Sequence, residues 1–357
     1  MRNHLSIFAG KQALGKIRDG GLRADDVKVL AGAAGGPKWL VLGHLDRYLF
    51  TSFFKHRQKP LFLMGSSSAA WRFAAASQAD PQASIQRFED AYINQSYDDN
   101  PTPADVSAEA LNILKHLLGK QGANEILTHP FLRLNFMTVR SRGLTRSSRK
   151  ANLFVGLSLA VGFNFIHRRL LGWFFERGLF FDSSDMPPFA GMRDLPMQNI
   201  ALTPDNLEKG LLASGSIPWI MAGVTNIPNA PQGVYRDGGV IDYHMDIPFL
   251  GQQDGIVLFP HYQERVIPGW FDKQIPWRKP IAANMENVLL LAPSPAFVES
   301  LPDKKIPDRN DFYAYKEKDR ERMAAWQKAV EISQRLADEF ADAVDSGRIK
   351  QAVQPLI

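Results

Sequence analysis

Three consecutive serines lie between a short apolar run and an alanine-rich segment. The run Leu61–Met64 predicts a buried strand and Ala70–Ala76 predicts a helix, so the serines occupy a tight strand-to-helix turn. In α/β hydrolases a serine on such a turn is held exposed at the end of the sheet, and the residues two before and two after it must be small to let the backbone close. Ser67 meets this requirement, with Gly65 and Ala69 at the two offsets.

The two neighbouring serines fit the spacing less well. Ser66 fails because Met64 stands two positions before it, whereas Ser68 has Ser66 and Ala70 at the two offsets and stays open as a candidate. A serine at this place also caps a helix without any chemistry, so a polar N-cap is the alternative interpretation of the turn.

A glycine-rich turn follows the strand predicted at Val27–Ala31. It reads GAAGGPK and ends in Lys38. The backbone N–H groups of Gly35 and Gly36 in such a turn point toward a common spot, which suits an anion or an oxyanion. Neither nucleotide-binding glycine motif is present, since G-x-G-x-x-G is absent and Trp39 follows Lys38. The alternative is a helix packed closely on a strand through its glycines.

An acidic residue stands far downstream in an Asp-Gly-Gly sequence that starts at Asp237. Asp-Gly is a common turn signal, so a turn is the alternative for Asp237 on its own. If a histidine served as base instead, His244 and His261 would be the nearest downstream of the eight scattered histidines. No metal-ligand motif occurs, and we expect neither a metal nor a cofactor.

The glycine turn, the serine turn and the Asp-Gly-Gly sequence occur in an order that resembles the patatin-like phospholipase family. That family carries a D-G-G-G-x-R/K loop, a G-x-S-x-G turn and a D-G-G/A turn. The small-residue stretch Ala213–Pro218 also looks like the loop that commonly precedes the aspartate there. The resemblance covers about residues 27–260. This chain departs from the family in having Ala33-Ala34 in place of Asp-Gly and Ala69 in place of the last glycine, which leaves substrate preference open.

The resemblance implies a three-layer α/β/α patatin-like fold with a mixed, mostly parallel central sheet. It also implies a carboxylic ester hydrolase that acts on a lipid or phospholipid ester. Ser67 would attack the ester carbonyl, Asp237 would accept the proton, and the N–H groups of Gly35 and Gly36 would hold the oxyanion. Lys38 would fix the loop or bind a lipid phosphate. Two alternatives stay open: an acyltransferase with the same dyad, and a non-catalytic protein that binds anionic lipid.

Composition places the chain among ordinary globular proteins. Of its 357 residues 45% are hydrophobic, and none is cysteine, which excludes disulfides and thiolate chemistry.

We predict a hydrolase domain at 1–300 and a C-terminal helical appendage at 301–357 with a long helix at about 316–345. A short amphipathic helix is predicted at residues 5–18. No secretory signal pattern follows the first residue, so a cytoplasmic protein is expected, with peripheral association at the inner membrane face.

Basic residues cluster next to an uncharged stretch. The formal net charge of +5 is too small by itself to indicate a nucleic-acid partner. Residues 140–150 contain five basic side chains and no acid, and residues 151–166 carry no charge. This stretch is too short to span a bilayer. We interpret residues 140–175 as a surface that docks on an anionic membrane; a buried helix, a lid or a dimer contact stays open. The sequence leaves the oligomeric state, the lipid and the ester position undetermined.

Overall fold

A ten-stranded mixed β-sheet forms the centre of the computed structural model, which describes residues 3–98 and 100–356. The strand order is β10-β1-β9-β8-β2-β3-β4-β5-β6, and β7 pairs beside β4. The strands are β1 (Leu5–Ala9), β2 (Val27–Gly32), β3 (Leu61–Ser66), β4 (Leu132–Ser141), β5 (Phe175–Phe181), β6 (Met197–Ala201), β7 (Val234–Asp237), β8 (Ile256–Pro260), β9 (Val288–Pro293) and β10 (Gln354–Pro355). The pairs β1–β9, β4–β5 and β4–β7 are antiparallel and the others parallel.

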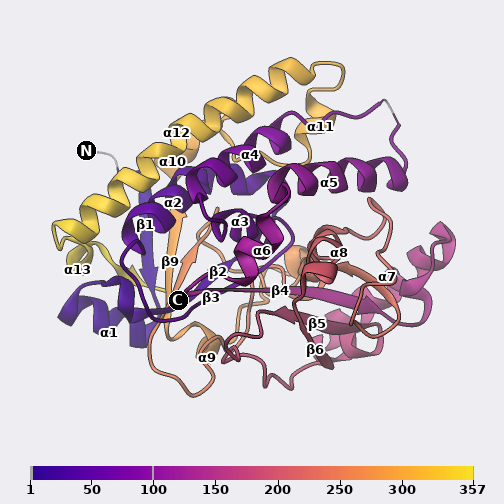
Figure 1. Cartoon of the computed structure of the whole chain (residues 1–357), viewed down its shortest axis with the longest axis horizontal. Helices are drawn as coiled ribbons and strands as arrows, with labels where there is room; N and C mark the ends of the chain where they lie inside the picture. Colours follow the sequence, from indigo (N-terminus) through magenta and orange to yellow (C-terminus); the bar gives the residue numbers. More distant parts are fainter. Residues whose placement is uncertain (1–2, 99, 357) are drawn as a thin grey trace.

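Helices surround this sheet. Strands β3, β5, β8 and β9 are buried along their whole length, and β2 and β4 at all but one residue each, as expected when both faces are covered. The helices are α1 (Lys11–Gly20), α2 (Gly43–Tyr48), α3 (Ser68–Ala76), α4 (Pro81–Ile93), α5 (Pro103–Leu118), α6 (Gly122–Leu127), α7 (Lys150–Ile166), α8 (Pro204–Gly215), α9 (Ala282–Met285), α10 (Pro295–Glu299), α11 (Asp311–Ala314), α12 (Asp319–Asp345) and α13 (Ile349–Ala352). Figure 1 shows α2, α4, α5 and α12 together along the upper side of the molecule, with α1 and α9 on the lower side. The predicted α/β fold class with a mixed, mostly parallel sheet is confirmed.

The prediction of one helix over residues 5–18 was wrong. The first half of that segment is β1, which pairs antiparallel with β9 and buries alternate side chains. The chain breaks at Gly10, where a Cβ atom would lie 1.9 Å from the carbonyl oxygen of Met285, and α1 begins at the next residue. Over so short a run, the apolar residues of β1 fit the period of a helix as well as the two-residue period of a strand. Pairing with β9 makes this segment a strand.

The C-terminal residues contribute to the same assembly. The predicted long helix is α12, which packs along α2 and also contacts β1. Beyond it, β10 adds a short parallel strand beside β1. The boundary proposed at residue 300 stays a prediction.

Strand β4 aligns the ends of two other strands. β3 runs parallel to its first part and ends at Ser66, opposite Met137. β7 runs antiparallel to its second part and ends at Asp237, opposite Thr138. Because β5 occupies the other edge of β4, β3 and β7 lie on one edge and their carboxyl ends meet. The serine turn and the Asp-Gly-Gly sequence are therefore adjacent, although they are 170 residues apart in the chain.

A buried ion pair joins the helix after the serine turn to the helix after the glycine turn. Arg72 of α3 donates two hydrogen bonds to the carboxylate of Asp46 in α2, at 2.6 and 2.7 Å. Both side chains are almost completely buried. Two charges removed from water in this way stabilise the fold only while they remain paired.

We predict that Asp46→Asn lowers the free energy of unfolding by about 3 kcal/mol, because it leaves the Arg72 guanidinium buried without a counter-charge. The double variant Asp46→Leu/Arg72→Met is expected to lose less than the single variant. Urea denaturation measures both. As a control, Glu331→Gln breaks the exposed pair with Lys328 and is expected to change stability by less than about 0.5 kcal/mol. A double variant that is less stable than the single one would contradict this account.

Candidate active site

The backbone at Ser67 adopts a conformation that non-glycine residues rarely take. Its φ is 56° and its ψ is −133°, between the end of β3 and the first residue of α3. A Cβ atom on Gly65 would lie 3.0 Å from the backbone carbon and the Cβ of Ala69. The small residues expected at these two offsets are therefore needed to close this turn. Backbone strain of this kind is concentrated at functional sites.

The hydroxyl of Ser67 contacts the carboxylate of Asp237. The Oγ atom donates a hydrogen bond of 2.8 Å to Oδ2 of Asp237. The other carboxylate oxygen accepts the backbone N–H of Gly239 at 2.7 Å. On the serine side, the backbone N–H of Ser67 donates to Oγ of Ser214 at 3.0 Å. Both partners are thus held from a second direction, which fixes the geometry of the Ser–Asp contact.

The small-residue stretch 213–218 forms the support beneath this pair. Ser214 contacts the serine turn, and the carbonyl of Ser216 accepts the backbone N–H of Asp237 at 2.9 Å. Ser214 Oγ also donates to the carbonyl of Met137 in β4 at 2.7 Å. The end of α8, with Ser216 that follows it, therefore connects the serine turn, the aspartate and the strand that aligns them.

The neighbouring serines have other surroundings. Oγ of Ser66 donates to the carbonyl of Asp242 at 3.2 Å. Oγ of Ser68 is buried and has no hydrogen-bond partner among the described residues. The structure thus brings Ser67, of these three serines, together with Asp237. That these two residues are catalytic stays a prediction.

Burial raises the pKa of Asp237 to about 6. The hydrogen bonds from Ser67 and Gly239, and the positive charges of Arg309 and Lys273, lower the pKa and oppose this effect only in part. A carboxylate with a pKa near the working pH is a stronger base than an exposed one and is still ionised at neutrality. Asp237 therefore has the properties needed to accept the proton of a hydroxyl that it already contacts.

Gly35 and Gly36 line the same cavity of about 200 Å³ as Ser67 and Asp237. Their N–H groups have no hydrogen-bond acceptor among the described residues. At Gly35 a Cβ atom would lie 2.5 Å from the ring of Tyr262, and Gly36 has a φ of +58°, so both positions require glycine. Unpaired N–H groups beside a serine are what an oxyanion site needs.

The loop before these glycines is fixed by a buried hydrogen-bond chain. The N–H of Ile267 donates to Nδ1 of His244 at 2.9 Å, so the ring proton is on Nε2. Nε2 then donates to the hydroxyl of Tyr262 at 2.8 Å, and this hydroxyl donates to the carbonyl of Ala34 at 2.5 Å. The N–H of Ala34 is also bonded, to the carbonyl of Tyr243. Ala34 is thus held on both sides, immediately before Gly35.

Neither downstream histidine is placed to serve as a base for Ser67. His244 is used in the chain just described, and burial lowers its pKa well below the usual value. Nδ1 of His261 accepts the N–H of Gln263, and burial lowers its pKa to about 3. Neither histidine hydrogen-bonds Ser67 or Asp237 in the structure, so both are neutral buried side chains outside the Ser–Asp pair.

Three cationic side chains line the cavity: Lys38, Lys273 and Arg309. None of them forms an ion pair with a described residue. The Lys38 ammonium lies 4.9 Å from the centre of the Tyr262 ring. Burial lowers the pKa of Lys273 to about 8, and the charges of Lys38 and Arg309 contribute to that decrease. Mutual repulsion among three cations is relieved when an anion binds between them.

Sequence reasoning found only one of these cations. Lys38 was a candidate because it follows the glycine turn, whereas Lys273 and Arg309 come from segments without a motif. Asp308, which also lines the cavity, is paired with Lys305 at 3.1 Å. No local pattern in the sequence marks these residues, because their common feature is the cavity that the fold creates.

Comparisons with known proteins add little to this picture. No protein-family profile and no curated protein matches the chain. Among solved structures it is similar to VipD from Legionella pneumophila, with 11% sequence identity and a TM-score of 0.33. The similarity covers 72% of this chain and 53% of VipD. Proposals about function must therefore rest on the site itself.

We predict that Ser67→Gly is more stable than Ser67→Ala by about 1 kcal/mol. Glycine adopts a φ of 56° without strain, whereas alanine retains a Cβ atom and the cost that goes with it. Urea denaturation of the two variants gives the difference. At Ser68, the first residue of α3, glycine is expected to be no more stable than alanine, because a helical backbone favours alanine. Equal stabilities of the two Ser67 variants would show that the turn is unstrained.

Proposed function

We propose that this protein is a serine-dependent lipid acyl hydrolase that uses a Ser67–Asp237 dyad. The observation that carries the proposal is the 2.8 Å hydrogen bond from Ser67 to Asp237, beside glycine N–H groups in one cavity. A nucleophile, a base in contact with it and oxyanion donors are the three parts that acyl transfer needs. The resemblance of the three motifs to patatin-like phospholipases supports the same assignment.

In the proposed reaction, Asp237 accepts the Ser67 proton while Oγ forms a bond to the ester carbonyl carbon. The N–H groups of Gly35 and Gly36 stabilise the negative charge on the carbonyl oxygen. As the ester C–O bond breaks, Asp237 returns the proton to the departing alcohol. Water then attacks the acyl-serine by the same route, Asp237 accepting its proton, and the carboxylic acid and free Ser67 are formed.

The charges of the cavity favour an ester that also carries an anionic group, as a phospholipid does. Lys38, Lys273 and Arg309 have no ion-pair partners among the described residues, and a phosphate would supply the charge that they lack. The volume of about 200 Å³ is below the 300 Å³ or more of typical ligand clefts. We therefore propose that the ester and its anionic group occupy the cavity, while most of a long acyl chain stays outside.

Ser67→Ala is expected to lower kcat for ester hydrolysis by about 10⁶, and Asp237→Asn by at least about 10³, because they remove the nucleophile and the base. A fluorophosphonate probe followed by peptide mass mapping is expected to label Ser67 in the wild type. Ser68→Ala is the matched control and is expected to retain most activity, since its hydroxyl has no partner. Labelling of Ser68, or a folded Ser67→Ala variant with full activity, would refute the dyad.

The pH dependence tests the base. Asp237 acts in its deprotonated form, so kcat/KM is expected to increase as pH rises through about 6 and then to level off. The increase near pH 6 is expected for neutral and anionic esters alike, because the serine must lose its proton in both reactions. A rate that does not change between pH 5 and 7 would exclude Asp237 as the base.

The cations are tested at higher pH. With an anionic ester, kcat/KM is expected to decrease above about pH 8 as Lys273 loses its charge, while a neutral ester shows no decrease. Lys273→Met is expected to lower kcat/KM for the anionic ester roughly tenfold at pH 7 and to abolish the decrease. Lys273→Arg retains the charge and is the matched control. Equal effects of Lys273→Met on both esters would show that the cations do not bind substrate.

A further inference from the structure

Helix α7 exposes large apolar side chains at one end of the molecule. Phe154, Phe165 and Ile166 are 61%, 60% and 74% exposed, and Val155, Leu159 and Val161 are exposed as well. Exposed apolar surface of this extent on one helix is unusual for a soluble monomer and indicates an interaction site. We call it the α7 surface, together with three exposed tryptophans whose rings contact phenylalanines of α7: Trp173, Trp219 and Trp277.

The buried side of α7 shows why its large residues face outward. Besides Leu153, the residues packed inward are small or polar: Gly156, Ala160 and Asn164. A Cβ atom on Gly156 would lie 2.8 Å from the backbone nitrogen of Thr145, so the helix approaches its neighbour closely. Asn164 donates a hydrogen bond of 2.7 Å to the buried carboxylate of Asp272. The helix is therefore fixed in this orientation, and the large side chains on its apolar side remain exposed.

Aromatic contacts join both ends of α7 to segments that line the catalytic cavity. The rings of Phe154 and Trp219 are 6.1 Å apart, and Pro218 lines the cavity. The rings of Phe165 and Trp277 are 6.0 Å apart, in the segment that follows Lys273. The α7 surface is thus continuous with the surroundings of the cavity on two sides.

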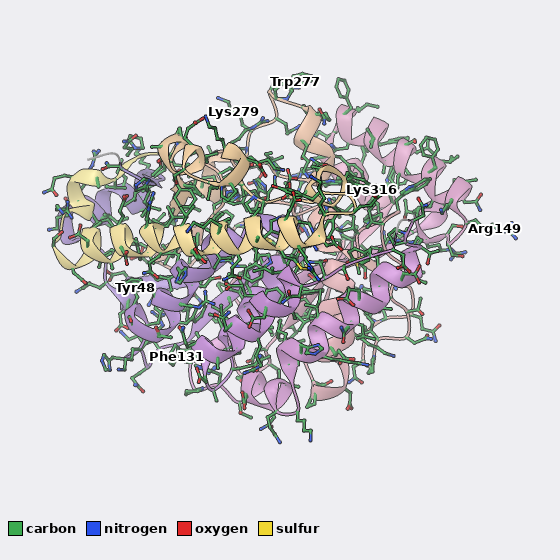
Figure 2. All side chains as sticks on the ribbon, turned by 90° about the horizontal axis from the view of Figure 1, so that it is seen from above. Tyr48, Phe131, Arg149, Trp277, Lys279 and Lys316 are labelled. Carbon is green, nitrogen blue, oxygen red and sulfur yellow. The ribbon has the colours of Figure 1, made fainter. Side chains whose placement is uncertain are left out.

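Basic residues accompany this surface, and residues 140–175 contain no acid. Within residues 140–175, the exposed cations that form no ion pair with a described residue are Arg146, Arg149, Lys150 and Arg169, and Lys279, two residues after Trp277, is a further one. In Figure 2, Trp277, Lys279 and Arg149 project from the edge of the molecule, and α7 forms the part of the edge between Trp277 and Arg149. Apolar and cationic groups are therefore presented together.

We propose that the α7 surface docks on a bilayer that contains anionic lipids. Aromatic and aliphatic side chains flanked by Lys and Arg suit the boundary between headgroups and acyl chains. A second copy of the chain fits less well, because a symmetric contact would bring the same cations together without counter-charges. Within residues 3–98 and 100–356 no helix has the length and apolar character needed to cross a bilayer, so the contact is interfacial.

Docking in this way would place the catalytic cavity near the lipid. Ile217 and Pro218 lie at the cavity and precede Trp219 of the α7 surface. A lipid ester could then reach Ser67 while most of its acyl chain remains in the bilayer, in keeping with the small cavity. This consequence rests on the proposed function, but the docking itself does not.

Vesicle co-sedimentation with the full chain carrying Ser67→Ala tests docking without hydrolysis, so its result does not depend on the proposed activity. We expect binding to vesicles that contain phosphatidylglycerol, little binding to pure phosphatidylcholine, and release as salt rises. Arg146→Glu/Arg149→Glu/Lys150→Glu is expected to lower the partition coefficient at least tenfold. The matched control Arg320→Glu/Lys328→Glu/Arg335→Glu reverses three exposed charges on α12 and is expected to bind more than the first triple variant.

The apolar part of the proposal needs a separate measurement. Vesicles with brominated acyl chains are expected to quench the fluorescence of Trp173, Trp219 and Trp277, and Phe165→Ser/Ile166→Ser is expected to weaken binding at constant charge. Quenching that is absent while anionic vesicles still bind would overturn insertion of the α7 surface. Equal binding to neutral and anionic vesicles, or a dimer in sedimentation velocity that Phe165→Ser/Ile166→Ser dissociates and that does not bind vesicles, would overturn the proposal.

Discussion

The length of β4 is the constraint on which the candidate site depends. Its first part pairs with β3 and its second part with β7, both on the same edge, so the ends of two strands of opposite direction meet. Ser67 begins the turn after one strand and Asp237 ends the other. Their hydrogen bond follows from backbone pairing and requires no flexible loop. A site placed by strand register is more precise than one placed by loops, because each ladder hydrogen bond fixes the position along the strand.

Buried polar contacts fix the remaining parts around this pair. The chain from His244 through Tyr262 holds the carbonyl of Ala34, and the Arg72–Asp46 pair connects the helices that follow the two turns. These contacts lie in a low-dielectric interior, where a satisfied hydrogen bond is strong and a broken one is costly. These contacts fix the positions of the glycine N–H groups relative to the serine hydroxyl. Such preorganisation lowers the cost of stabilising charge when it develops.

Helix α7 follows a different principle from the helices around the sheet. A surface helix normally buries its large apolar residues, yet α7 packs through Gly156 and Ala160 and leaves Phe154 and Phe165 exposed. Its apolar composition fits a helix buried in the core as well as a helix with an exposed apolar face, and composition alone cannot distinguish between these two arrangements. What separates them is the close approach that the small residues permit on the inner side. The helix can therefore be held tightly against the rest of the protein by its inner side and still expose an apolar face on its outer side.

The sequence by itself determined the local conformations whose causes are local. Small residues around Ser67 indicated the strand-to-helix turn, the glycines indicated a turn with free N–H groups, and the long helix predicted at about 316–345 is α12. Residues 5–18 were mispredicted because a short run fits two periods, and pairing with β9 resolved it. Only the tertiary structure decided that Asp237 contacts Ser67, and that His244 and His261 form no hydrogen bond with either residue. It also decided that Lys273 and Arg309 share a cavity with Lys38. These contacts join residues that are far apart in the chain. They are determined by strand register and helix packing, which no local sequence pattern encodes.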